Sequence, residues 1–139
     1  EAAGCETYFN KKDHLWTLYE YETGQFKLPE STEAGMIYGG CNCGNCHITI
    51  SSNGDIMACR RVTDSKVANI FEDRLADIWI CQMEKYRDYD KFVKCSKCEL
   101  KAWCRGCPAV ANGTSGNFYG ADPQCWKTEN EITGEALSC

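Results

Sequence analysis

The chain has 139 residues, of which twelve are cysteine, and a formal net charge of −5 at pH 7. Leu, Ile, Val and Phe together make up 23 of the 139 residues, or about 17%. This fraction is below the roughly 20% expected of a well-cored domain. The acidic balance without a basic stripe argues against nucleic acid, and no apolar run is long enough to span a bilayer. We therefore expect one small domain whose stability depends on metal or covalent cross-links.

Residues 1–38 form the first expected unit, a linker or N-terminal segment before the cysteine-rich part. Residues 15–28 carry apolar and aromatic runs on either side of Thr23-Gly24, which predicts a hairpin or an edge segment with that pair as the turn. The stretch 29–40 is rich in Gly, Ser, Thr and Glu and predicts a loop. The second expected unit, residues 39–139, contains most of the cysteines.

Residues 47–61 predict a β-hairpin, because His47 to Ser51 alternates and Asn53-Gly54 favours a tight primed turn. Its strands are expected to bring Cys46 close to Cys59. His47, at a strand start, is expected to lie at the surface and not to bind metal.

Apolar residues at helical spacing predict a helix over about 71–91 with a break near Cys81; they are Phe71, Leu75, Ile78, Trp79, Met83 and Tyr86. We expect this stripe to be core and Cys81 to be a buried small hydrophobe. Residues 94–123 are loop-rich, and 124–136 predict a short final helix. The expected fold class is α+β, a small metal-stapled domain in which a β-hairpin is followed by helices and cysteine-rich loops.

Nine closely spaced cysteines are the candidate metal ligands: Cys41, Cys43, Cys46, Cys59, Cys95, Cys98, Cys104, Cys107 and Cys125. Nine thiolates are too many for one ion, and soft thiolate selects iron–sulfur clusters, zinc or cuprous copper. Structural zinc usually separates its two C-x2-C pairs by a dozen or more residues. Here five residues separate them, which is closer to the cysteine runs of ferredoxins. The sequence therefore favours iron–sulfur clusters over zinc.

Disulfides are the alternative for an even number of cysteines in a secreted protein. The short spacings and the lack of a signal peptide in the sequence argue against them, so we expect a reducing cytoplasm. Arg60, Arg61 and Arg105 each adjoin a candidate ligand. Two interpretations of these arginines are open from the sequence: they stabilise a reduced cluster by their charge, or they are solvated surface residues.

The ordered cysteines resemble the SPASM domain, the C-terminal auxiliary-cluster module of radical SAM enzymes that modify peptides and proteins. The resemblance covers about residues 38–126 and rests on Cys41 or Cys43, then Gly54 and Cys59, then Cys95, Cys98, Cys104 and Cys107, then Asp122 to Cys125. Cys104 and Cys107 are separated by two residues where the family has three. Cys5, Cys81 and Cys139 match nothing in the family pattern.

The resemblance implies two interleaved [4Fe–4S] clusters. Cluster II would be held by Cys95, Cys98, Cys104 and Cys125, and cluster I by Cys59, Cys107 and two of Cys41, Cys43 and Cys46. Of these, Cys41 with Cys46 is the preferred pair, because a C-x-C pair cannot easily grip one iron.

The resemblance also implies an electron-transfer and substrate-placing role in an enzyme that modifies a ribosomally synthesised peptide. The C-x3-C-x2-C motif that binds S-adenosylmethionine is missing, so the chain alone should be inactive. S-adenosylmethionine, a third cluster, the radical SAM barrel and the peptide substrate would belong to the full-length enzyme. A stand-alone ferredoxin-like electron carrier and a zinc-stapled interaction module are the alternative functions.

Overall fold

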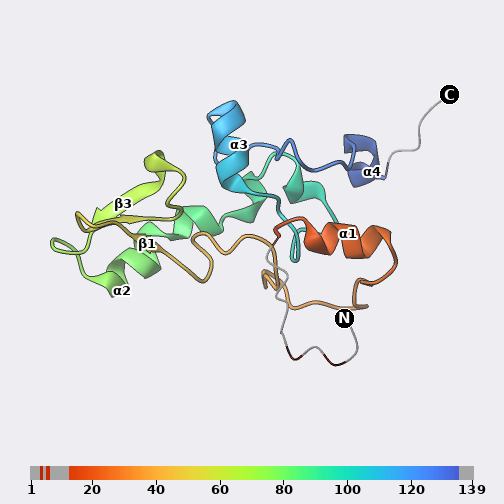
Figure 1. Ribbon diagram of the computed structural model, residues 1–139, viewed down its shortest axis with the longest axis horizontal. Helices are drawn as coiled ribbons and strands as arrows, with labels where there is room; N and C mark the ends of the chain where they lie inside the picture. Colours follow the sequence, from red (N-terminus) through yellow and green to blue (C-terminus); the bar gives the residue numbers. More distant parts are fainter. Residues whose placement is uncertain (1–3, 5, 7–12, 135–139) are drawn as a thin grey trace.

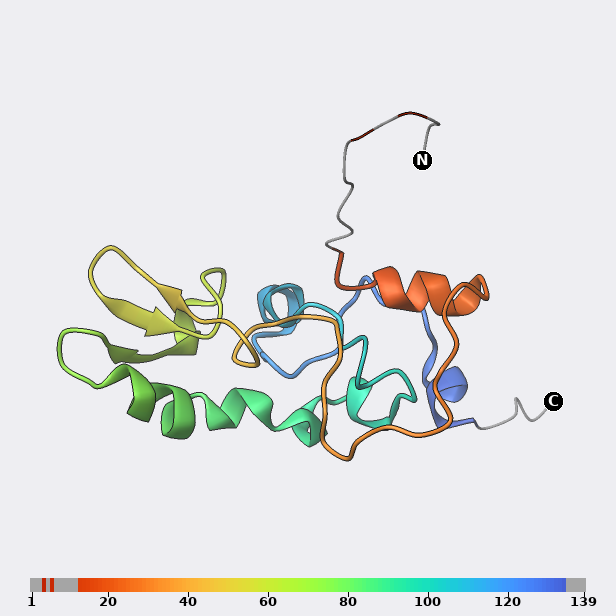
Figure 2. The same ribbon diagram turned by 90° about the horizontal axis from the view of Figure 1, so that it is seen from below.

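The structure is a computed structural model that describes residue 4, residue 6 and residues 13–134. A small sheet and the short helix α2 lie at one end of the long axis, α1 and α4 lie at the other, and α3 lies between them (Figures 1 and 2). No helix within the described ranges combines the length and the apolarity needed to cross a membrane.

The sheet has three antiparallel strands in the order β1-β2-β3. Strands β1 (Thr49–Ile50) and β2 (Asp55–Met57) pair with Thr49 opposite Met57, so the predicted hairpin is confirmed. Strand β3 (Lys66–Asn69) adds to β2 and was not expected. Three of its four residues are half-buried, so it lacks the in-and-out alternation that marks a strand in the sequence.

The hairpin turn differs from the expected primed type. Gly54 has a φ of +84°, whereas no described non-glycine residue has a positive φ, and a type I′ turn requires positive φ at two successive residues. The Gly54 N–H donates to the Ser51 carbonyl oxygen at 2.9 Å. Residues 51–54 therefore form an ordinary turn whose last residue is the left-handed Gly54.

The predicted hairpin at residues 15–28 is wrong, because this segment contains helix α1 (Trp16–Glu22). Leu15 and Leu18, three residues apart, are buried, and the Asp13 carboxylate accepts the Leu15 N–H at 2.7 Å. The burial of Leu15 and Leu18 at helical spacing therefore favours a helix over the expected hairpin. The expected turn at Thr23-Gly24 directly follows the helix.

The predicted helix over 71–91 exists as a series of short helical turns that start at Leu75. They are α2 (Leu75–Asp77), the π-helical turn η2 (Ile78–Gln82), and the 3₁₀ turns η3 (Glu84–Arg87) and η4 (Tyr89–Lys91). In η2 the Met83 N–H donates to the Ile78 carbonyl oxygen at 3.0 Å. This five-residue step shifts the register of the helix around the predicted break.

The register shift divides the predicted apolar stripe. Ile78, Met83 and Tyr86 are buried as expected. Phe71 is 81% exposed and precedes the first helical turn, and Leu75 is also exposed, so their placement in the core was wrong. Cys81, within the π-helical turn η2, is exposed as well, so its expected burial was wrong.

The remaining elements are η1 (Thr63–Ser65), η5 (Cys95–Lys97), α3 (Pro108–Ser115) and α4 (Glu129–Thr133). Helix α3 lies within the stretch expected to be loop-rich, although Pro108 at its start and Gly116 at its end are ordinary boundary residues. Helix α4 lies within the predicted final helix, and Thr128 and Glu131 form a reciprocal capping box at its start.

Two small hydrophobic clusters contain cysteines. The first joins the sheet to the helical turns and is formed by Ile56, Ala58, Cys59, Val62, Ile78, Met83, Tyr86, Phe92, Cys95 and Phe118. The second packs α1 on the cysteine-rich loop and is formed by Leu15, Leu18, Leu100 and Cys104. Candidate metal ligands, namely Cys59, Cys95 and Cys104, are thus among the buried residues of the hydrophobic core.

Gly54→Ala should lower the free energy of unfolding by about 1–3 kcal/mol. An added Cβ would lie 2.6 Å from the Phe71 ring and 2.8 Å from Asn69 Oδ1, on a backbone with positive φ. The matched control is Gly113→Ala in α3, where an added Cβ meets nothing within 4 Å and should stabilise the helix by up to about 1 kcal/mol. Urea unfolding followed by circular dichroism, with all proteins in the same metal state, checks this. Equal effects at both glycines would contradict it.

Candidate metal centre

Three sulfurs meet beside the sheet and form what we name sulfur group I: Cys41, Cys43 and Cys59. The Cys43 thiol is hydrogen-bonded with both of the other sulfurs, which lowers the pKa of Cys41 to about 6 and that of Cys59 to about 6 and raises the pKa of Cys43. Cys43 is therefore the last of the three to lose its proton. Without any metal, group I already favours a thiolate near neutral pH.

Local structure fixes both sides of group I. Cys59 follows β2, and its N–H donates to the buried Ser65 hydroxyl at 3.1 Å. Ser65 in turn donates to the Val62 carbonyl oxygen at 2.6 Å. Cys41 and Cys43 come before β1, so the antiparallel pairing of β1 with β2 returns the chain to them.

The hairpin was expected to bring Cys46 to Cys59, but Cys43 is the residue that reaches it. Cys46 is exposed, whereas Cys43 is half-buried in contact with Cys41 and Cys59. The Asn42 carbonyl oxygen accepts the backbone N–H groups of Asn45 and Cys46 at 3.0 and 3.2 Å. This tight turn directs Cys43 inward and leaves Cys46 at the surface.

Two arginines hold the loop of residues 39–47 from opposite ends. Arg87 donates from Nε to the Gly44 carbonyl oxygen at 2.9 Å and from Nη2 to the Trp79 carbonyl oxygen at 2.6 Å. Arg105 donates to the Gly39 carbonyl oxygen at 2.9 Å and to the Cys41 carbonyl oxygen at 2.5 Å. The backbone around group I is therefore fixed by charge-assisted hydrogen bonds.

The second group of sulfurs, sulfur group II, consists of Cys95, Cys98, Cys104 and Cys125, which interact electrostatically with one another. Burial, with a further contribution from the other three thiols, raises the pKa of Cys95 to about 12. Burial also raises the pKa of Cys98 and of Cys104. Burial therefore disfavours the thiolate forms of Cys95, Cys98 and Cys104, and a bound metal centre would supply compensating positive charge.

Two lysines lie beside group II. Lys94 Nζ donates to the Cys125 carbonyl oxygen at 3.1 Å. Lys127, 9% exposed, pairs with Glu99 at 3.0 Å and acts electrostatically on Cys98. Both cations lie where they offset negative charge on the sulfurs.

Asp122 joins the loops of Cys107 and Cys125. Its buried carboxylate accepts the Cys107 N–H at 2.7 Å, and its carbonyl oxygen accepts the Cys125 N–H at 3.0 Å. Gly106 has a φ of +63°, and a Cβ there would lie 2.6 Å from Asp122 Cβ, so only glycine permits this close contact. The interactions of Cys107 in the described part of the chain run through its backbone. Its thiol as a ligand stays a prediction from the resemblance.

The three arginines beside candidate ligands differ in burial. Arg105 is 3% exposed, whereas Arg60 and Arg61 are exposed. Burial lowers the pKa of Arg105, although arginine remains charged at neutral pH. Arg105 is therefore a buried cation, whereas Arg60 and Arg61 are surface residues. The sequence alone did not distinguish the three by burial.

The other sequence predictions concern residues outside the two groups. His47 is exposed ahead of β1, as expected for a surface histidine. Cys81 lies exposed in η2. Cys5 and Cys139 lie outside the described residues.

The sequence analysis did not single out three residues that contact the loops or sulfurs of the two groups: Arg87, Tyr89 and Asp122. Asp122 stands in the Asp-Pro-Gln-Cys stretch that carries part of the resemblance, so its position was a usable indication. Arg87 and Tyr89 lie in the predicted helix, where neither spacing nor composition distinguishes them from surface residues.

The residues fit an iron–sulfur centre in their chemistry. No three His, Cys, Asp or Glu side chains within the described ranges are placed to hold one metal ion together. The Tyr89 hydroxyl is buried and has no hydrogen-bond partner among the described residues. It lies within electrostatic reach of Cys46 and Cys41, where a cluster sulfur would be an acceptor.

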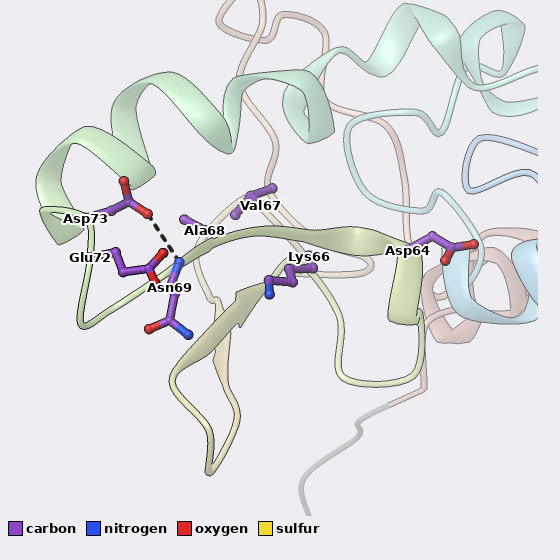
Figure 3. A pocket seen from close by; sticks show the side chains of 7 residues that line it. All are labelled: Asp64, Lys66, Val67, Ala68, Asn69, Glu72 and Asp73. Atoms are coloured by element: carbon purple, nitrogen blue, oxygen red, sulfur yellow. Dashed lines mark hydrogen bonds between the residues drawn. The ribbon is translucent and has the colours of Figure 1, made fainter.

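A separate surface hollow of about 610 Å³ lies along β3 and the turn that follows it, and it contains no cysteine. Figure 3 shows its lining, in which the Asn69 N–H donates to the Asp73 carboxylate at 3.2 Å. Its Lys66 pairs with Asp55 at 2.6 Å. The hollow is thus acidic and distinct from both sulfur groups.

Comparison with known proteins gives one match. The family model for SPASM, described as an iron-sulfur cluster-binding domain, matches residues 41–108. The matched stretch contains eight of the nine candidate ligands, and Cys125 lies beyond it. Neither the curated proteins nor the solved structures gave a match.

Cys43→Ser should remove iron from the site that also loses iron in Cys59→Ser, because Cys43 contacts both Cys41 and Cys59. Cys46→Ser is the matched control, since it changes an exposed cysteine in the same loop, and should retain the wild-type iron content. Iron analysis with Mössbauer spectroscopy of the reconstituted variants checks this. Loss of iron in Cys46→Ser with retention in Cys43→Ser would reverse the assignment.

Proposed function

Because residues 41–108 belong to the SPASM family of iron–sulfur cluster-binding domains, we propose that the chain is the auxiliary-cluster domain of a radical SAM enzyme that modifies a peptide. The proposal includes two [4Fe–4S] clusters, one at each sulfur group. The observation that carries it is the presence of two separate groups of cysteine sulfurs whose members lie in the two hydrophobic clusters.

Each sulfur group has a proposed ligand set. Group II supplies four thiolates from Cys95, Cys98, Cys104 and Cys125. Group I supplies three, and the resemblance adds Cys107 as the fourth, from a loop that Asp122 ties to that of Cys125. This assignment gives each cluster the four cysteines that it needs.

A bound iron–sulfur cluster supplies one-electron oxidation and reduction at a potential set by charge, hydrogen bonds and solvent exposure. The described residues act on all three of these properties. The hydrophobic clusters around Cys59, Cys95 and Cys104 exclude water. Lys94, Lys127 and Arg105 offset negative charge, and backbone hydrogen bonds hold the cysteine loops in place.

In the complete enzyme the domain accepts an electron from a substrate radical after the new bond has formed, and it helps to place the peptide. This role requires a radical SAM barrel as partner and a peptide, ribosomally made in our proposal, as substrate. A reducing cytoplasm would keep the thiols available for the metal.

Anaerobic reconstitution with iron and sulfide should give a brown protein with about eight irons and eight sulfides per chain, as two four-iron clusters require. Cys81→Ser is the control, because Cys81 is exposed and belongs to neither sulfur group, and it should bind as much iron as the wild type. Metal analysis with electron paramagnetic resonance of the reduced protein measures this. A colourless protein with stoichiometric zinc would contradict the proposal.

A further inference from the structure

Arg105 lies between the two sulfur groups. It directly follows Cys104 of group II in the chain, and its guanidinium donates to the Cys41 carbonyl oxygen of group I at 2.5 Å. It is within electrostatic reach of the sulfurs of Cys41, Cys104 and Cys95. One buried cation therefore faces both groups.

The surroundings of Arg105 leave its positive charge without an ion-pair partner in the described part of the chain. Its hydrogen bonds go to backbone carbonyl oxygens, those of Gly39 and Lys101 in addition to Cys41. The Tyr89 ring stacks on the guanidinium, with 4.7 Å from Cζ to the ring centroid. Burial of an unpaired charge is costly, so a negative group nearby is the expected compensation. The nearby cysteine sulfurs are the groups that would become anionic on binding a cluster.

We propose that Arg105 is a positioning residue common to both sulfur groups, and that its fixed charge raises the reduction potential of the cluster at each of them. This inference rests on the proposed function, since it requires that both groups hold clusters. It assigns a role to a residue that is not itself a ligand.

The physical reason is the extra negative charge that reduction brings. A cluster that takes one electron from an external reductant such as dithionite gains one unit of negative charge. A buried cation stabilises the reduced form more than the oxidised form, because the low dielectric of the interior leaves their attraction poorly screened. Exposed charges such as those of Arg60 and Arg61 are screened by water and salt and have little effect.

Redox titration of the reconstituted chain with dithionite, followed by electron paramagnetic resonance, tests the proposal on two variants. Arg105→Gln removes the charge but keeps hydrogen-bond donors. It should shift the one-electron reduction of both clusters at least about tenfold toward the oxidised form, which is about 59 mV in each midpoint potential. Arg105→Lys keeps the charge and should restore both potentials most of the way to the wild-type values.

Arg60→Gln is the matched control, because it removes an exposed charge beside Cys59, and should leave both potentials unchanged. Unchanged potentials in Arg105→Gln, or a shift in one cluster alone, would overturn the proposal. If Arg105→Gln fails to retain iron, the iron content of Arg105→Lys decides. Retention in the lysine variant supports a role of charge, and loss in both variants contradicts it. A wild-type chain that binds no iron would instead refute the proposed function.

Discussion

The structure depends on the contact between the chain ahead of Cys41 and the loop that leads to Cys104. The N–H groups of Tyr38 and Gly39 donate to the Ala102 carbonyl oxygen at 2.7 and 3.1 Å, and Arg105 returns two hydrogen bonds to the same segment. Residues some sixty positions apart in sequence are thereby held backbone to backbone.

The apolar core is small because cysteines occupy part of it. Each hydrophobic cluster contains candidate ligands among its buried residues, and α1 packs its leucines directly on Leu100 and Cys104. Burial makes the thiols of Cys95, Cys98 and Cys104 reluctant to ionise, while a bound metal centre needs them as thiolates. The free energy of metal binding is therefore coupled to the free energy of folding, as in other small metal-stapled domains.

Much of the site was predictable because it depends on local spacing. The hairpin around Gly54, the final helix and the grouped cysteines follow from turn residues and short ligand intervals, which act over a few positions. Helix α1 was missed because Leu15 to Tyr21 satisfies both strand and helix patterns, and tertiary packing on Leu100 decides between them. The inward position of Cys43 depends on a turn closed by Asn42.

Longer-range features had no counterpart in the sequence. The burial of Arg105 results from the contact with residues 39–41, so the residue looked no different from Arg60 or Arg61. The exposed Cys81 lies in a π-helical turn, which has no composition of its own. The burial of Arg105 arises from a contact between distant segments, and such contacts are those that a single sequence specifies least directly.

We propose that the two separate sulfur groups each hold a cluster. Anaerobic native mass spectrometry of iron-loaded Cys98→Ala tests it most directly, because Cys98 belongs to group II and lies apart from the Cys41, Cys43 and Cys59 contacts. We expect a mass that retains one four-iron cluster of the two bound by the wild-type chain. Retention of both clusters, or loss of both together, would contradict it.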